Sequence, residues 1–238
     1  MASCHRQKIN QIFRKDSRKI TGIFSFRCLH DTVKQRVGER GQTVKGMTGV
    51  VLAGGQSRRF GSPKAFAKFK GKYFFEIAVE TLRTVAEDIY IVSHPSLVEC
   101  FRQKTVEKVI MDDERYRGQG PLAGIYTVMK KSEAEWIFVL PCDMPYMRPE
   151  VAEKLAKYAN EKFDAIICAH FGRIQPLVGM YHRRTFEQIE KLLQAKDNRM
   201  KSLLHRCHVR YVTEQDFWEN EIVFRNVNKP NEFDDIVT

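Results

Sequence analysis

The stretch from Val50 to Lys64 holds the residues whose types and spacing could do chemistry. An apolar run ends in the paired glycines Gly54 and Gly55, and three cations follow within ten residues. Glycines lack the Cβ atoms that would hold a phosphate away from backbone N–H groups. Arg59 offers a planar fork of donors and Lys64 a point charge, which together could neutralise a nucleoside triphosphate. The alternative is a plain strand-to-helix turn with surface cations.

This loop does not have the spacing of the two best-known phosphate-binding loops. The sequence contains neither Gly-x-x-x-x-Gly-Lys-Ser/Thr nor Gly-x-Gly-x-x-Gly. The second absence argues against an oxidoreductase that uses a dinucleotide. The loop therefore predicts a nucleotide site of another kind.

Asp143 follows the most apolar run of the chain, residues 136–140, and stands in a turn between Pro141 and Pro145. We expect its carboxylate to be held stiffly at the end of a strand. Mg²⁺ prefers hard oxygen ligands and commonly bridges one or two carboxylates to substrate phosphates. Asp143 is therefore the candidate metal ligand, and the alternative is an aspartate that caps a helix or a turn.

Asp112 and Asp113 follow another apolar run, residues 109–111. Either carboxylate could bind ribose or base or assist a metal ion. Side chains of adjacent residues diverge at a strand end, so we expect only Asp112 to face the site. A solvated acidic turn is the alternative.

Residues 118–124 form a glycine-rich loop, which either lets a sugar or base lie close to the backbone or only permits close helix–sheet packing.

Apolar periodicity indicates alternating strands and helices after residue 46. Strands are expected at 48–53, 88–93, 106–111, 136–140, 164–170, 176–181, 209–212 and 222–226. Helices are expected at 73–86, 97–104, 121–131, 149–160, 183–195 and 200–205, with a last turn at 231–236. This alternation predicts a three-layer α/β/α fold with a mainly parallel, Rossmann-like sheet. Its ligands would lie beyond the carboxyl ends of the strands, where the glycine loop, His94, Asp112 and Asp143 can gather.

The charge of the chain is concentrated before residue 47. The 238 residues carry a formal charge of +11. Residues 1–46 hold eleven Lys or Arg and three Asp or Glu, whereas the remaining 192 hold twenty-nine and twenty-six. We therefore expect a basic, dispensable extension at 1–46 and one catalytic domain at 47–238. An organelle-targeting peptide or a nucleic-acid-binding arm are the alternatives for the extension.

Cysteine spacing and hydropathy indicate where the protein works. Six cysteines are scattered without a C-x-x-C pair, which favours a reduced, intracellular protein over a disulfide framework. No apolar run approaches the roughly 18 residues of a membrane span. The expectation is a cytoplasmic protein that binds neither membrane nor nucleic acid.

Five motifs carry a resemblance to a known family. They are Leu52-Ala53-Gly54-Gly55-x-Ser57-x-Arg59-x-Gly61-x-x-Lys64, Gly120-Pro121-Leu122-Ala123-Gly124, Pro141-Cys142-Asp143-Met144-Pro145, Gln175-Pro176-Leu177 and Asn226-Val227-Asn228-Lys229-Pro230. With them the chain resembles, from about residue 47 to its end, the nucleotidyltransferases that have a fold like that of the sugar-nucleotide transferases. Within that group it is most similar to the molybdenum cofactor guanylyltransferases. The glycine signature alone is shared with cytidylyl-, uridylyl- and other guanylyltransferases. The Pro-Cys-Asp-x-Pro turn combined with the late Asn-x-Asn-x-Pro motif is more specific.

The resemblance implies transfer of GMP from GTP to the terminal phosphate of molybdopterin, with release of pyrophosphate. It implies that the guanine nucleotide is bound by Leu52, Ala53, Gly54, Gly55, Lys64 and Asp112. Asp143 would bind both the nucleotide and Mg²⁺, and Asn226 and Asn228 would lie toward the pterin. One departure is that the family often has asparagine where this chain has Ser93-His94-Pro95.

The expected mechanism is electrostatic. Both the attacking phosphate and the α-phosphate are anions, and Asp143 with its Mg²⁺, Lys64 and Arg59 would offset their repulsion. Because the attacking phosphate is already ionised at neutral pH, the expected reaction needs no general base. The expected partners are GTP and molybdopterin, with transient contact to other molybdenum cofactor biosynthesis proteins or apo-molybdoenzymes.

Two other functions stay open at this point. One is a sibling enzyme that uses CTP, or that acts on another phosphorylated acceptor, because spacing does not separate guanine from cytosine. The other is a non-enzymatic protein that binds nucleotides or nucleic acid through the basic extension.

Overall fold

The structure is a computed structural model that describes residues 46–55, 60–217, 219–229 and 232. The chain divides into two units, Met1–Arg40 and Gly41–Thr238, and every described residue belongs to the second. Residues 1–45 of the extension predicted at 1–46, Arg59 and nearly all of the last helical turn expected at 231–236 lie outside the described residues.

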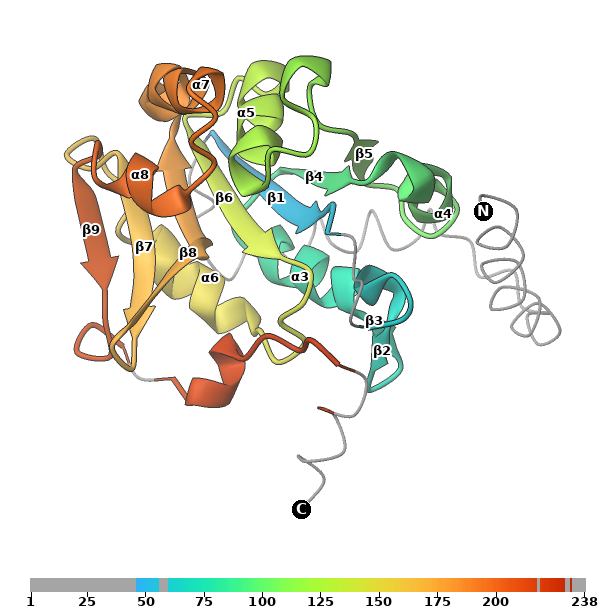
Figure 1. The fold of residues 1–238 in the computed structure, drawn as a ribbon. Helices are drawn as coiled ribbons and strands as arrows, with labels where there is room; N and C mark the ends of the chain where they lie inside the picture. The colour runs from blue at the N-terminus through green and yellow to red at the C-terminus, as the bar shows by residue number, and fades with distance from the viewer. Residues whose placement is uncertain (1–45, 56–59, 218, 230–231, 233–238) are drawn as a thin grey trace, which may run out of the picture. The chain divides into compact units, whose positions relative to one another are not determined.

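A seven-stranded sheet forms the centre of the second unit (Figure 1). Its strands are β1 (Met47–Ala53), β4 (Asp88–Ser93), β5 (Lys108–Ile110), β6 (Trp136–Pro141), β7 (Ala165–His170), β8 (Arg173–His182) and β9 (Val209–Val212). They are ordered β5-β4-β1-β6-β8-β7-β9. Only β8 runs antiparallel to its neighbours, β6 and β7, and the other pairs are parallel. The predicted mainly parallel sheet is therefore confirmed.

Helices cover both faces of this sheet. They are α3 (Phe74–Arg83), α4 (Val98–Arg102), α5 (Pro121–Lys131), α6 (Pro149–Ala156), α7 (Phe186–Gln194) and α8 (Met200–Leu204). Helices α3, α4 and α6 pack on one face, and α5, α7 and α8 on the other (Figure 1). The three layers that the sequence predicts are thus present.

The strands serve two separate hydrophobic cores because successive side chains point to opposite faces. In β1, Val50 packs with the α5 and α7 side, while Val51 packs with the α3 and α6 side. In β6, Val139 and Phe138 divide in the same way. A strand buried on both faces must be apolar throughout, which is why these strands read as continuous apolar runs.

Two local features differ from the expectation. The strand predicted at 222–226 is wrong: Glu221–Phe224 forms a 3-10 helix. Its start is capped by Asn220, whose side-chain oxygen accepts the Ile222 N–H at 3.1 Å, and a short apolar run does not by itself distinguish strand from helix. The hairpin of β2 (Lys68–Phe69) and β3 (Lys72–Tyr73) was not expected from the sequence.

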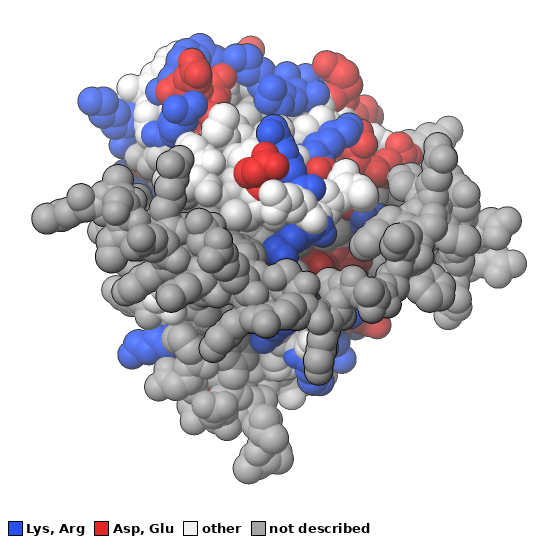
Figure 2. Space-filling model, turned by 90° about the vertical axis from the view of Figure 1, so that its right-hand side faces the viewer, with Lys and Arg blue, Asp and Glu red and all other residues white. Residues whose placement is uncertain are grey.

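The surface of the described residues mixes both signs of charge. On the face drawn in Figure 2, lysine and arginine side chains lie beside aspartate and glutamate side chains. None of the helices in the described ranges is long and apolar enough to cross a membrane.

Candidate active site

A cavity of about 910 Å³ opens where β1, β4, β5 and β6 end. Its volume lies in the upper part of the range of about 300–1,000 Å³ that is typical of ligand pockets. Predicted site residues that line it are Leu52, Ala53, Gly54, Gly55, Lys64, Asp112, Asp143, Asn226 and Asn228. The structure brings these residues together, whereas Arg59 lies outside the described residues. Their roles in binding and catalysis stay predictions.

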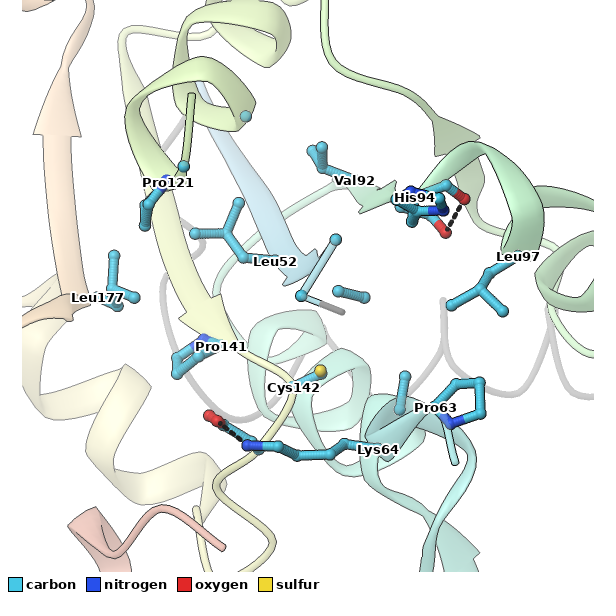
Figure 3. A pocket seen from close by; sticks show the side chains of 18 of the residues that line it. Leu52, Pro63, Lys64, Val92, His94, Leu97, Pro121, Pro141, Cys142 and Leu177 are labelled. Atoms are coloured by element: carbon cyan, nitrogen blue, oxygen red, sulfur yellow. Dashed lines mark hydrogen bonds and ion pairs between the residues drawn. The ribbon is translucent and has the colours of Figure 1, made fainter. Parts of the chain in front are cut away.

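Lys64 joins three segments that are far apart in the sequence. It begins a 3-10 helix, Lys64–Phe66, and its ammonium extends beneath Cys142 to a carboxylate (Figure 3). Lys64 Nζ donates to Asp143 Oδ2 at 3.0 Å and to Asn228 Oδ1 at 2.8 Å. The Lys64 and Asp143 side chains are only 15% and 23% exposed. Water therefore screens this ion pair less than a surface pair.

Asp143 is held at the rim by the backbone on both sides of it. The preceding Cys142 N–H donates to the Leu52 carbonyl oxygen at 3.2 Å, which extends the contact between β1 and β6. The Asp143 carbonyl oxygen accepts the Val227 N–H at 2.9 Å. These bonds orient the turn so that the carboxylate faces the cavity.

The donor set at Asp143 fits a magnesium ion that is shared with a phosphate-bearing ligand. A carboxylate at the rim of a cavity provides hard oxygen atoms, and Mg²⁺ usually completes its shell with waters and substrate phosphates. In the part of the chain that the structure describes, no group of three His, Cys, Asp or Glu side chains is arranged to hold a metal ion. Asp143 would therefore be a ligand beside phosphate and water oxygens.

The neighbours Asp112 and Asp113 diverge, as the sequence predicts. Asp112 lines the cavity, and its Oδ2 accepts the Gly118 N–H at 3.3 Å. Burial raises the pKa of Asp112, although the Gly118 N–H opposes that shift. Asp113 is not among the cavity residues and instead accepts Lys130 Nζ at 2.8 Å. That hydrogen bond is the main reason why the pKa of Asp113 is lowered to about 2.

The glycines around the cavity have different tasks. A Cβ atom at Gly55 would meet no atom of the described residues within 4 Å. At Gly124 it would lie 2.7 Å from Leu52 Cδ2, so this glycine lets α5 approach β1. Gly118 and Gly120 have φ angles of 78° and 76° and adjoin open space. Close helix–sheet packing is therefore confirmed at Gly124, whereas a sugar or base lying beside Gly118 and Gly120 stays a prediction.

One group beside Asp143 is unsuited to be a nucleophile. Burial raises the pKa of the Cys142 thiol to about 12, so it stays protonated at neutral pH.

Comparison with known proteins decides the family. The model of the MobA-like NTP transferase domain matches residues 49–211. The chain belongs to this family. A protein of Geobacillus sp. (strain WCH70) named probable molybdenum cofactor guanylyltransferase is 89% identical over 192 residues, which are 81% of this chain and 98% of that protein. A protein of the same name from Bacillus cytotoxicus is 39% identical over 195 residues, covering 82% of this chain and 98% of that protein.

One solved structure agrees with this family assignment, and a more distant one shares the fold. The crystal structure of molybdopterin-guanine dinucleotide biosynthesis protein A from Archaeoglobus fulgidus is 25% identical, with a TM-score of 0.68. The match covers 79% of this chain and 96% of that protein. The same fold is present in the structure of CMP:2-keto-3-deoxy-manno-octonic acid synthetase complexed with CTP, which is 16% identical, with a TM-score of 0.60. That match covers 81% of this chain and 97% of the synthetase.

The cavity of this MobA-like chain also has an apolar wall, in which only Leu52 had an expected role. Figure 3 shows an apolar wall in which Leu52 lies between Pro121 and Val92, with Leu177 nearby. Leu52 and Val92 lie near the ends of β1 and β4, and Pro121 begins α5, so the boundaries of these elements in the sequence indicated them. Leu177 lies in the middle of β8, and no such boundary indicated it. His94 lines the cavity as well, and its Nδ1 lies 2.8 Å from Ser96 Oγ.

Proposed function

We propose that this protein transfers GMP from GTP to the terminal phosphate of molybdopterin, which forms molybdopterin guanine dinucleotide and pyrophosphate. The family match and the relative that is 89% identical support this reaction. The observation that carries it is the shared cavity, in which Lys64 contacts both Asp143 and Asn228. The Lys64 ammonium would lie between the GTP side of the cavity, at Asp143, and the molybdopterin side, at Asn228. A cation at that position suits the transfer of GMP to a phosphate.

In this proposal the nucleotide lies along the glycine loop. The N–H groups at Gly54 and Gly55 would face the phosphates, because glycine permits close approach of the backbone. Leu52 and Ala53 would contact the nucleoside, and Asp112 would accept hydrogen bonds from its ribose or base. Asn226 and Asn228 would contact the pterin substrate.

Asp143 would hold Mg²⁺ together with the nucleotide phosphates. When bound, the ion would supply positive charge that stabilises the pyrophosphate as it leaves. Lys64 would bind the same phosphates as a point charge, and Arg59 would bind them through its guanidinium fork.

The reaction itself needs no covalent intermediate on the protein. An oxygen of the molybdopterin phosphate would form the new bond to the α-phosphorus of GTP, and the bond to pyrophosphate would break. The attacking oxygen is already ionised at neutral pH, so no side chain has to remove a proton. The protein's contribution would be to orient the two phosphates and to offset their repulsion.

The proposal assigns the activity to residues 47–238 and none of it to the basic extension at 1–46. It is supported by the family match, which begins at residue 49, and by the relatives, which this chain covers almost completely over 192 and 195 residues. The same proposal puts the reaction in the cytoplasm, with transient contact to other molybdenum cofactor biosynthesis proteins or apo-molybdoenzymes.

Pyrophosphate release with each of the four nucleoside triphosphates tests the proposal. Each reaction is run with and without molybdopterin, and with and without Mg²⁺. Pyrophosphate should appear with GTP only when molybdopterin and Mg²⁺ are both present. Preference for CTP would identify a sibling cytidylyltransferase, and release that does not depend on molybdopterin would contradict the proposed acceptor.

A further inference from the structure

The Lys64 ammonium forms an ion pair with the carboxylate of Asp143, the candidate metal ligand. Its Nζ is 3.0 Å from Asp143 Oδ2. Asn228 Oδ1 accepts from the same ammonium at 2.8 Å. Two acceptors from distant segments thus hold the lysine at Asp143.

A divalent cation and an ammonium cannot use one carboxylate independently. Both would lie against the same carboxylate, and their like charges repel at a separation of a few ångströms. The low exposure of the two side chains reduces the screening of that repulsion. A cation that binds Asp143 must therefore displace Lys64 or tolerate its charge.

A triphosphate in the cavity would remove this conflict. It brings up to four negative charges to a site that is lined by Lys64, Asp143 and the glycine loop. The flexible lysine stem lets the ammonium turn from the carboxylate to a phosphate oxygen. The vacated carboxylate oxygen is then available to a cation that the phosphates also bind.

We propose that Lys64 is a resident counter-ion which keeps divalent cations off Asp143 until a nucleoside triphosphate draws its ammonium away. Asn228 is a positioning residue in this arrangement, because its Oδ1 accepts a hydrogen bond from Lys64. The cation then enters with the nucleotide and not before it. This inference rests on the proposed function only in taking a triphosphate as the ligand.

Binding of Mn²⁺ without any nucleotide tests the inference directly. The free Mn²⁺ signal in electron paramagnetic resonance gives the affinity of the full-length wild type, of Lys64→Met and of Lys64→Gln. Both variants remove the charge while keeping an extended side chain. Each should bind Mn²⁺ about tenfold more tightly than the wild type, because one like charge beside the ion is gone. Adding Asp143→Asn to either variant should abolish the gain.

Lys108→Met is the matched control. Lys108 Nζ forms an ion pair of similar length with Asp88 Oδ1, 2.9 Å, at the starts of β5 and β4. This pair lies at the amino-terminal ends of the two strands, whereas the cavity lies at their carboxyl ends, so its loss should leave Mn²⁺ affinity unchanged. Thermal unfolding of each variant shows that it is folded.

The inference is wrong if both folded Lys64 variants bind Mn²⁺ no more tightly than the wild type, or if Lys108→Met gives the same gain. Its failure is distinct from failure of the proposed function. The Mn²⁺ measurement uses no nucleotide and no turnover, whereas the proposed function fails only if GTP and molybdopterin give no pyrophosphate.

Discussion

The Val227 N–H donates to the carbonyl oxygen of Asp143 at 2.9 Å, across 84 positions of the chain. The Val227 side chain is fully buried and packs with Phe60 and Phe74. Residues 226 and 228 on either side line the cavity. One buried valine therefore anchors both candidate acceptor residues and the turn that carries the candidate metal ligand.

Val227→Ala should weaken that anchor. The lost contacts should lower the free energy of unfolding by about 2 kcal/mol, because two buried carbon atoms and their packing are removed. Turnover at saturating substrate should fall as well, because Asn226 and Asn228 lose their fixed position. Thermal unfolding and steady-state rates measure the two effects. Val106→Ala is the control, since Val106 is 71% exposed and should affect neither.

Asp143→Ala should nearly abolish guanylyl transfer while the protein stays folded. Removal of an electrostatic group that acts on the transition state typically lowers the rate by about 10²–10³-fold. Pyrophosphate release and the circular dichroism spectrum check the two parts. Asp88→Ala, at the opposite edge of the sheet, is the control and should retain its activity. A rate for Asp143→Ala close to that of the wild type would show that the site is assigned wrongly.

Asp112→Ala and Asp113→Ala should have different effects, although the two residues are adjacent. Asp112 lines the cavity, so its loss should raise the Kd for GTP with little change in stability. The Asp113 carboxylate accepts hydrogen bonds from Lys130 Nζ at 2.8 Å and from the Arg115 N–H at 3.1 Å, so its loss should chiefly lower the melting temperature. Calorimetric GTP titration and thermal unfolding separate the two. Equal loss of GTP affinity in both variants would contradict the divergent orientation.

His170 should make stability depend on pH. It is 1% exposed, and in the described part of the chain neither of its ring nitrogens has a hydrogen-bond partner. Burial lowers its pKa below 6.5, an effect that the carboxylates of Glu214, Glu219 and Asp216 oppose and the ammonium of Lys154 reinforces. As the pH falls below 6.5, His170 is therefore protonated in the unfolded chain before it is protonated in the folded one. The free energy of unfolding decreases as the pH falls through the folded-state pKa.

Urea unfolding between pH 5 and pH 8 measures this dependence. The ring of His170 packs against the rings of Phe217 and Phe224 at centroid distances of 4.9 Å, so His170→Phe should be accommodated. That variant should lose less stability than the wild type between pH 7 and pH 5. The pKa of His182 is also lowered by burial, and its contribution stays in both proteins. An unchanged slope in His170→Phe would exclude His170 as the cause.

A chain that begins at Met47 should be as active as the full chain. Its kcat and its KM for GTP should match those of residues 1–238, because the candidate site residues all follow residue 46. The measurement is pyrophosphate release by both proteins at equal concentration. Loss of activity in the shortened chain would show that the basic extension belongs to the working enzyme.

The sequence alone determined the features that depend on local chemistry. Continuous apolar runs such as 136–140 required strands that are buried on both faces, and these alternate with helices. The position of Gly54, Asp112 and Asp143 directly after such runs predicted that they would meet at one edge of the sheet. These are consequences of chain direction and side-chain type, so they need no knowledge of distant contacts.

Only the tertiary structure decided which groups touch. The bond from Lys64 to Asn228 spans 164 positions, and no local pattern encodes a contact between segments so far apart. The same holds for the antiparallel entry of β8 beside β6, which brings Leu177 to the cavity. Glu221–Phe224 is a 3-10 helix and not a strand. Asn220 caps its start, and two of its side chains pack into the core that also holds α3 and α6. Such tertiary packing overrides a short apolar pattern.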